Sequence, residues 1–331
     1  MRKATIRDVA KKAQVSISTV SNALNDVAVV KPTTKARVLE AAAALNYTPN
    51  LMGKQLRSGE TSMISFFTDS VAGPYFYTLV EALSKAVEHY GYGLNVTLTN
   101  DHDVLMNTLR GNTADGVIIF NHLINQTDVA QIKAQHIPTV MLDRMASGYK
   151  MQSLIFDSFA SSYAMTQHLL SLGHRHLGYL AGYPTSRDSR ERLAGFQQAI
   201  LDAGIPERNI VILEGLFEET TSFKAVQAYL ATHAQTQLTA FLAGNDLSAI
   251  GVIKALNQLG YRVPDDFSVA GFDDIEIAQY FRPALTTVHN PIAQQAEQTV
   301  QMLMAMLNGT PMKAQHTLKG ELVIRQSTAK V

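Results

Sequence analysis

Short apolar segments alternate with helical stretches along residues 61–331. Ten segments have the length and apolar content of buried strands: SMISFF, LNVTL, DGVIIF, TVMLD, SLIFD, LGYLAG, IVILEG, AFLAGND, SVAGFD and TTVHN. Repeated strand–helix units of this length predict parallel sheets covered by helices on both faces. Ten strands are too many for one compact six-stranded sheet, so we expect two similar α/β lobes.

Polar residues stand at the ends of several predicted strands. They are Asp69, Asp143, Asp157, Asn245, Asp246 and Asp273. In parallel α/β sheets, ligands bind beyond the carboxyl ends of the strands. Carboxylates there suit the recognition of hydroxyl groups, and they equally suit a catalytic pair, so the strand ends alone leave binding and catalysis open.

Residues 1–48 have a different pattern, that of three short helices. Thr5 and Asp8 form a start signal for the first helix, whose apolar residues recur at helical spacing until Gln14. Ser16 can cap a second helix, and Pro32 suits the first turn of a third. Two helices joined by a tight turn, followed by a third, predict an all-α helix-turn-helix domain.

Charge separates this head from the rest of the chain. Residues 1–57 contain ten Lys and Arg and three acidic residues, a net charge of +7, and the remaining residues carry −7. The exposed positions of the second helix hold short side chains that can approach base edges and phosphates: Ser16, Ile17, Ser18, Ser21, Asn22 and Asn25. A basic head with such a helix predicts binding to double-stranded DNA.

Several classes of function lack their sequence signals. There is no P-loop, no G-x-G-x-x-G after a strand and no G-x-S-x-G elbow, so we expect no enzyme activity and no cofactor. His174 and His176 have no third ligand in sight, so we expect local hydrogen bonds and no metal site.

Cysteine is absent, which suits a reducing cytosol. The N-terminus lacks the apolar region of a signal peptide, and no apolar run approaches the ~18 residues of a membrane span. We therefore expect a cytoplasmic protein with no membrane partner.

The head resembles that of the LacI/GalR family of bacterial repressors. The similarity is carried by TIRDVAKKAQVSISTVSNALN, by KARV from Lys35 and by NYTPN at 46–50. It implies that Ile17, Ser18 and Asn22 face the major groove, and that phosphates lie near Thr5, Ser16, Ser21, Asn25 and Thr34. Many members have Arg where this chain has Asn22, and Ser where it has Lys31. Because Arg reads guanine best and Asn reads adenine, the operator is expected to differ.

Residues 49–60 form the predicted hinge helix and linker. Asn50 can cap two helical turns after Pro49, and helices this short are marginal alone in water. The resemblance implies that this helix folds on operator DNA and that Leu56 wedges into the minor groove. Gly53 replaces the more usual Ala and lowers helix propensity by ~1 kcal/mol.

The resemblance continues through residues 61–331, in GHRHLGYLAG, RLAGFQQAI, AGNDLSAIGVIKAL, VAGFDD, RPALTTV and ELVIRQST. It implies a two-lobed periplasmic-binding-protein-like body with crossovers near residues 160, 288 and 320. Lobe 1 would comprise about 61–159 plus 289–319, and lobe 2 about 160–288 plus 320–331. The residues implied to line an effector cleft are Asp69, Arg192, Asn245 and Asp273, with Phe217 as a stacking face. Tyr75 and Phe76 would lie at the mouth, and which of them points inward is open.

We therefore predict a homodimeric repressor of carbohydrate-related genes that binds operator DNA under the control of a small sugar or sugar-phosphate effector. Charged and amide groups beside an aromatic ring suit the hydroxyls and C–H faces of a sugar. The alternatives are a solute receptor, which the body alone would suit, and a sugar-processing enzyme with a DNA-binding head. Nothing in the sequence indicates a protein co-repressor.

Overall fold

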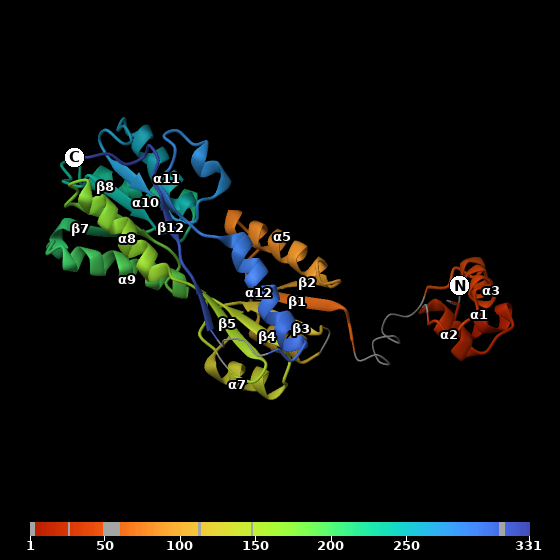
Figure 1. The fold of residues 1–331 in the computed structure, drawn as a ribbon. Helices are drawn as coiled ribbons and strands as arrows, with labels where there is room; N and C mark the ends of the chain where they lie inside the picture. Colours follow the sequence, from red (N-terminus) through yellow and green to blue (C-terminus); the bar gives the residue numbers. More distant parts are fainter. Residues whose placement is uncertain (1–3, 26, 49–59, 112–113, 147, 311–314) are drawn as a thin grey trace. The chain divides into compact units, whose positions relative to one another are not determined.

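The computed structural model describes residues 4–25, 27–48, 60–111, 114–146, 148–310 and 315–331. Contacts divide the chain into two compact units, Met1–Thr61 and Ser62–Val331. Each unit is described by itself below (Figure 1).

The first unit contains the three predicted helices, α1 (Ile6–Ala13), α2 (Ile17–Leu24) and α3 (Pro32–Ala44). The predicted signals are confirmed: the hydroxyl of Thr5 donates to the Asp8 carboxylate at 2.7 Å, and Ser16 Oγ accepts from Thr19 N at 3.1 Å. Gln14 ends α1 with a φ of 52°. The small core is formed by Val9, Ala10, Ala13, Val20, Ala23, Val38, Ala41 and Ala42.

The second unit contains a parallel sheet of six strands in the order β11-β5-β4-β3-β1-β2. They are β1 (Met63–Thr68), β2 (Gly93–Leu98), β3 (Gly116–Phe120), β4 (Thr139–Leu142), β5 (Met151–Phe156) and β11 (Gln315–Leu318). Successive side chains of a strand point to opposite faces, so Phe66 and Phe67 belong to different apolar clusters. Phe66 packs in the cluster of α5 (Pro74–Glu88) and α12 (Ile292–Leu307), and Phe67 in that of α6 (His102–Arg110) and α7 (Gln126–Ala134).

Four more parallel strands form a second sheet in the order β7-β6-β8-β9. They are β6 (Leu177–Ala181), β7 (Ile210–Glu214), β8 (Ala240–Ala243) and β9 (Ser268–Ala270). The helices of this lobe are α8 (Ser158–Ser171), α9 (Arg187–Asp202), α10 (Glu219–Thr232) and α11 (Asp246–Gln258), with 3-10 turns at Glu207–Asn209 and Glu276–Gln279. Beside the sheet, β10 (Thr287–His289) pairs antiparallel with β12 (Glu321–Val323).

The chain passes between the two sheets three times: from β5 into α8, from β10 into α12, and from β11 into β12. All ten predicted segments form strands. The strands β11 and β12 were not among the predicted segments, because β11 (QHTL) has exposed polar positions and β12 (ELV) is only three residues long. Among the described residues, no helix combines the length and the apolar character needed to cross a membrane.

Candidate functional site

The proposed DNA-reading positions gather on and around α2. Ile17 is 45% exposed although it is apolar, and Ser16, Ser18 and Asn25 are exposed as well. Asn22, Ser21, Thr34 and Thr5 are half-buried. Some of these groups also hold the head together, since Asn25 Nδ2 donates to Ser21 O at 2.7 Å. The hinge residues Asn50, Gly53 and Leu56 lie outside the described residues.

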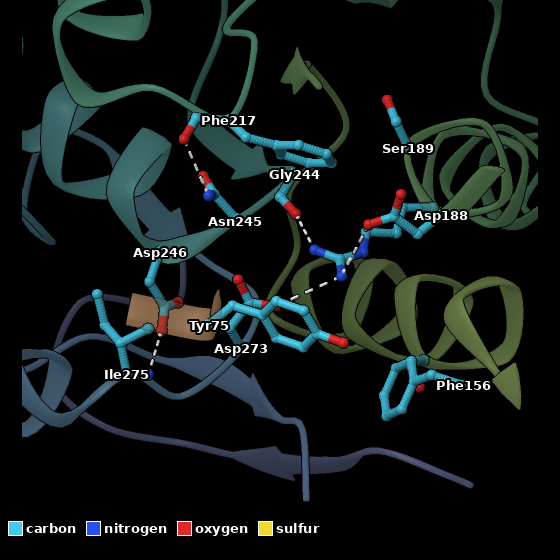
Figure 2. Close-up of polar contacts among 12 residues, drawn as sticks. Tyr75, Phe156, Asp188, Ser189, Phe217, Gly244, Asn245, Asp246, Asp273 and Ile275 are labelled. Carbon is cyan, nitrogen blue, oxygen red and sulfur yellow. Dashed lines mark hydrogen bonds and ion pairs between the residues drawn. The ribbon is translucent and has the colours of Figure 1, made fainter. Parts of the chain in front are cut away.

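Arg192 lies at the centre of the candidate effector site, on the second turn of α9. The crowding of Arg187, Asp188, Arg190 and Glu191 around it in the sequence also suits a surface ion pair, but its side chain is only 6% exposed. Nη2 lies 3.3 Å from Asp273 and 3.4 Å from Asp188, and Nη1 donates to the carbonyl of Gly244 at 2.5 Å (Figure 2). The guanidinium carbon lies 3.7 Å from the ring centre of Phe272. We call Arg192, Asp188, Asp273 and Asp143 the Arg192 cluster.

Asp273 reaches Arg192 through an unusual backbone conformation. Its φ is 111° and that of Asp274 is 58°, a region that side-chain-bearing residues rarely adopt. Asp273 N donates to Val288 O at 2.9 Å, which ties the turn to β10. Burial raises the pKa of Asp273 to about 6, against the opposing effect of Arg192. Two consecutive residues in such a conformation are typical of functional sites.

Asp143 adds a third carboxyl group from the other lobe. It follows β4, has a φ of 49°, and accepts a hydrogen bond from Phe156 N at 3.0 Å. Burial raises the pKa of Asp143 to about 6, and the charge of Asp188 acts in the same direction. The sequence analysis noted Asp143 only as a strand-end residue.

Tyr75 and Phe76 have different surroundings, which bears on the open question of which points inward. The hydroxyl of Tyr75 donates to Gln295 Oε1 at 3.0 Å. Burial raises the pKa of Tyr75 well above its usual value, and the charges of Asp143, Asp188 and Asp273 raise it further. Both rings contact Phe120, with ring centres 6.0 Å away for Tyr75 and 5.6 Å away for Phe76. Tyr75 is therefore the one that faces the acidic groups of the cluster.

Phe217 and Asn245 lie beside Arg192 on lobe 2. The Phe217 ring centre is 5.4 Å from the guanidinium carbon of Arg192. The backbone carbonyl of Phe217 accepts a hydrogen bond from Asn245 Nδ2 at 3.0 Å. Asn245 also caps α11 by accepting from Ser248 N at 2.9 Å. Gly182 is required here, because a Cβ at that position would overlap the Phe217 ring.

Asp69 is held elsewhere on lobe 1. Its carboxylate bonds to the ring of His122, and it accepts from His122 N at 3.1 Å. Its carbonyl accepts from Asn100 Nδ2 at 3.3 Å. None of the contacts of the described residues joins Asp69 to the Arg192 cluster.

Asp188 and Asp246 are the polar residues whose roles the sequence analysis missed. Asp188 lies four residues before Arg192, on the same face of α9, and this spacing could have revealed the pair. Asp246 is fully buried and accepts from Thr287 Oγ1 at 2.6 Å and from Ile275 N at 2.9 Å. Burial raises the pKa of Asp246 well above its usual value, so it serves lobe 2 as an internal hydrogen-bonding group.

The histidines of the GHRH segment bond to residues far away in the chain, and not locally as expected. His174 bonds to Thr239 Oγ1 at 2.8 Å and to Ala329 O at 3.1 Å. His176 Nε2 lies 3.4 Å from Asn209 Nδ2. In the part of the chain that the structure describes, no group of three or more His, Cys, Asp or Glu residues could hold a metal ion.

Comparisons with known proteins agree with this architecture. Residues 5–50 match the family of bacterial regulatory proteins, lacI family, and residues 166–328 match the periplasmic binding protein-like domain. The HTH-type transcriptional repressor PurR of Mannheimia succiniciproducens is 32% identical over 99% of both chains. That of Edwardsiella ictaluri is 33% identical over 98% of this chain and 97% of its own. The crystal structure of the Lac repressor dimer bound to operator and the anti-inducer ONPF has a TM-score of 0.86, with 27% identity over 99% of this chain and 100% of that chain.

The chain therefore belongs to the lacI family of bacterial regulatory proteins, and it is a DNA-binding transcription repressor. The predicted fold class is confirmed, with a helix-turn-helix head and a body of two α/β lobes. Because the relatives are transcription repressors, the chain is not an enzyme, and the enzyme and receptor alternatives are set aside.

Proposed function

We propose that this repressor binds near-palindromic double-stranded operator DNA as a homodimer, and that a small sugar-like effector at the Arg192 cluster controls its affinity for DNA. The Lac repressor, which was crystallised as a dimer with operator and an anti-inducer, supports the dimer and the two ligands. The division of the body into lobes of about 61–159 plus 289–319 and 160–288 plus 320–331 is part of the same proposal.

On the DNA side, Ile17, Ser18 and Asn22 read base edges in the major groove. The phosphates are contacted by Thr5, Ser16, Ser21, Asn25 and Thr34, and the hinge contributes Asn50, Gly53 and Leu56. The exposure of Ile17 and Ser18 on a helix of short side chains supports this assignment. Selection of duplexes from a random pool tests it, and a failure to enrich any near-palindrome would contradict it.

On the effector side, one observation carries the proposal: a buried guanidinium between two carboxylates, with the Phe217 ring beside it. Guanidinium and carboxylate groups form charge-assisted hydrogen bonds with hydroxyls, and an aromatic ring packs against the C–H face of a sugar. Asn245, Tyr75 and Phe76 complete the proposed site. Asp69 is also proposed to contact the effector, and this requires that its hydrogen bonds to His122 break first.

Thermal unfolding of the full chain with a panel of pentoses, hexoses, disaccharides, their phosphates and nucleobases tests the effector class. A compound at 100 times its dissociation constant stabilises by ~2.7 kcal/mol, which is readily measured. Nucleobases are included because a planar base could stack on Phe217. Stabilisation by nucleobases alone would contradict the sugar-like class.

Arg192→Gln should abolish the shift given by the stabilising compound. The matched control is Arg262→Gln, since Arg262 also pairs with two carboxylates, Asp265 and Asp266, but is 71% exposed. That control should leave the shift intact.

A further inference from the structure

Several buried polar atoms around the Arg192 cluster have no hydrogen-bond partner in the structure. They are Arg192 Nε, Asp273 Oδ1, Asn290 Oδ1 and Gln295 Nε2, on side chains that are almost wholly buried. Asp273 Oδ1 does lie 3.3 Å from Arg192 Nη2 in the ion pair, but the angles of this contact are not those of a hydrogen bond. The set contains two donors and two acceptors. A buried polar atom without a partner is costly, so such atoms indicate where a ligand can bind.

The chemistry of this set favours hydroxyl groups over phosphate. A hydroxyl both donates and accepts, so a polyol can satisfy Arg192 and Gln295 as well as Asp273 and Asn290. A phosphate dianion only accepts, so it would leave the oxygens of Asp273 and Asn290 unsatisfied. Asn290 and Asp273 are neighbours, because Asn290 N donates to Asp273 O at 3.3 Å.

The charges of the Arg192 cluster also favour hydroxyl groups over phosphate. Three carboxyl groups, Asp143, Asp188 and Asp273, act on a single buried guanidinium that is already paired twice. Their combined charge also acts on the hydroxyl of Tyr75. An anionic ligand at this position would meet an excess of like charge at low dielectric, where repulsion is strong.

Other arginines stand near the cluster, and they are engaged elsewhere. Arg187 pairs with Glu191 at 3.3 Å, although its charge is also felt by Asp143. Arg190 donates to the carbonyls of Pro184 and Thr185 at 3.0 and 2.9 Å. Burial lowers the pKa of Arg144, and the charge of Arg190 lowers it further. The inner groups, which a bound ligand would touch first, remain predominantly acidic.

We propose that the Arg192 cluster selects an uncharged or ammonium-bearing polyol and rejects its phosphorylated form, with Asp188 as the residue that sets this preference. The inference rests on the proposed effector site and narrows its ligand class. We assign the preference to Asp188 because its side chain is 25% exposed and lies 3.4 Å from Arg192 on the same helix. It can therefore contact both a bound ligand and the guanidinium.

Calorimetric titration of the full chain with matched sugars tests this selection. The probes are glucose, galactose and ribose, then glucose 6-phosphate, galactose 6-phosphate and ribose 5-phosphate, then glucosamine and galactosamine. We expect at least one free sugar or amino sugar to bind, and its phosphate to bind at least tenfold more weakly. A phosphate that binds as tightly as its parent sugar would overturn the selection and leave the sugar-like effector standing. Binding of none of the probes would overturn both proposals.

Two variants separate the role of Asp188 from a general charge effect. Asp188→Asn should reduce the ratio of free-sugar to phosphate affinity at least threefold. Glu191→Gln removes an equal charge from the same helix, at a residue that pairs with Arg187, and should change that ratio less than twofold. Equal changes in the two variants would show that the preference is not set by Asp188. Thermal unfolding and operator binding without sugar, measured on both variants, verify that each still folds.

Discussion

The exposed face of α2 and the Arg192 cluster are both rich in polar side chains, but they differ in burial. Ile17, Ser16 and Ser18 are exposed, on a helix whose stability comes from a small core on its opposite face. Arg192 and Asp273 are buried, and they form an ion pair with 3.3 Å between Nη2 and Oδ1. A surface for DNA needs no internal partners because water and phosphates supply them, whereas a buried ligand site must be stabilised from within.

The difference has a consequence for substitution. On α2, a changed side chain alters what is bound and leaves the fold largely as it was, since surface substitutions usually fall within ~0.5 kcal/mol. In the Arg192 cluster, the same kind of change affects binding and stability together, because it leaves buried charges unpaired.

The largest expected difference between the two regions is in the salt dependence of binding. If the basic heads of a dimer make 6–10 phosphate contacts, operator affinity should fall by roughly 10³–10⁵ between 50 and 200 mM salt. Buried pairs are screened much less, so the affinity for a sugar probe should change by less than about tenfold. Parallel titrations measure both, and equal salt dependence would contradict the comparison.

Arg192→Ala should lower the free energy of unfolding of the body by about 3–5 kcal/mol, because it leaves Asp273 and Asp188 without their cation. Arg262→Ala, which removes an exposed arginine from a similar pair of acids, should cost about 0–1 kcal/mol. Urea unfolding compares them. Similar losses in the two variants would mean that the Arg192 pairs contribute no more than surface pairs.

Asn22→Arg should change the base that the head prefers while leaving its stability nearly unchanged. Asn pairs best with adenine and Arg with guanine, and a good bidentate contact discriminates by ~1–3 kcal/mol. Duplex selection with both proteins measures the preferred base, and thermal unfolding of both measures stability. An unchanged preference would show that Asn22 does not read a base edge.

pH should affect the body through Asp143 and Asp273, whose pKa is about 6 in the folded chain. Unfolded carboxyls titrate near 3.9, so between about pH 4 and 6 the folded chain binds more protons than the unfolded one. The free energy of unfolding should therefore rise as the pH falls from 7 to 5, by on the order of 1–2 kcal/mol per carboxyl.

Asp143→Asn should flatten this pH profile, and its amide oxygen can still accept from Phe156 N. Histidines also contribute to the profile: the hydrogen bond to Asp128 raises the pKa of His102, and burial lowers the pKa of His168 and of His174. Their contributions are present in both proteins, so the difference between the two profiles reports on Asp143. A profile that is as steep in Asp143→Asn as in the parent chain would show that Asp143 does not titrate in this range.

Much of the fold was predictable because its signals are local. Apolar runs of strand length marked β1 to β10, and Ser16 and Pro32 marked the starts of α2 and α3. The strands β11 and β12 were not predicted, since these segments of four and three residues form strands by pairing with β5 and β10. The hinge prediction at Asn50, Gly53 and Leu56 stays a prediction.

The sequence by itself determined the helix-turn-helix head, the alternation of strands and helices, and the polar residues available at the strand ends, because periodicity and capping act over a few residues. The tertiary structure decided which of those residues meet. It brought Asp273 to Arg192 and turned Tyr75 toward the acidic groups there, whereas it drew Asp69 to His122. The burial that raises the pKa of Asp143 and Asp273 also arises only from the packing of segments far apart in the chain. No local pattern encodes the distance between such segments, so the burial and the pKa values of the Arg192 cluster depend on the tertiary structure.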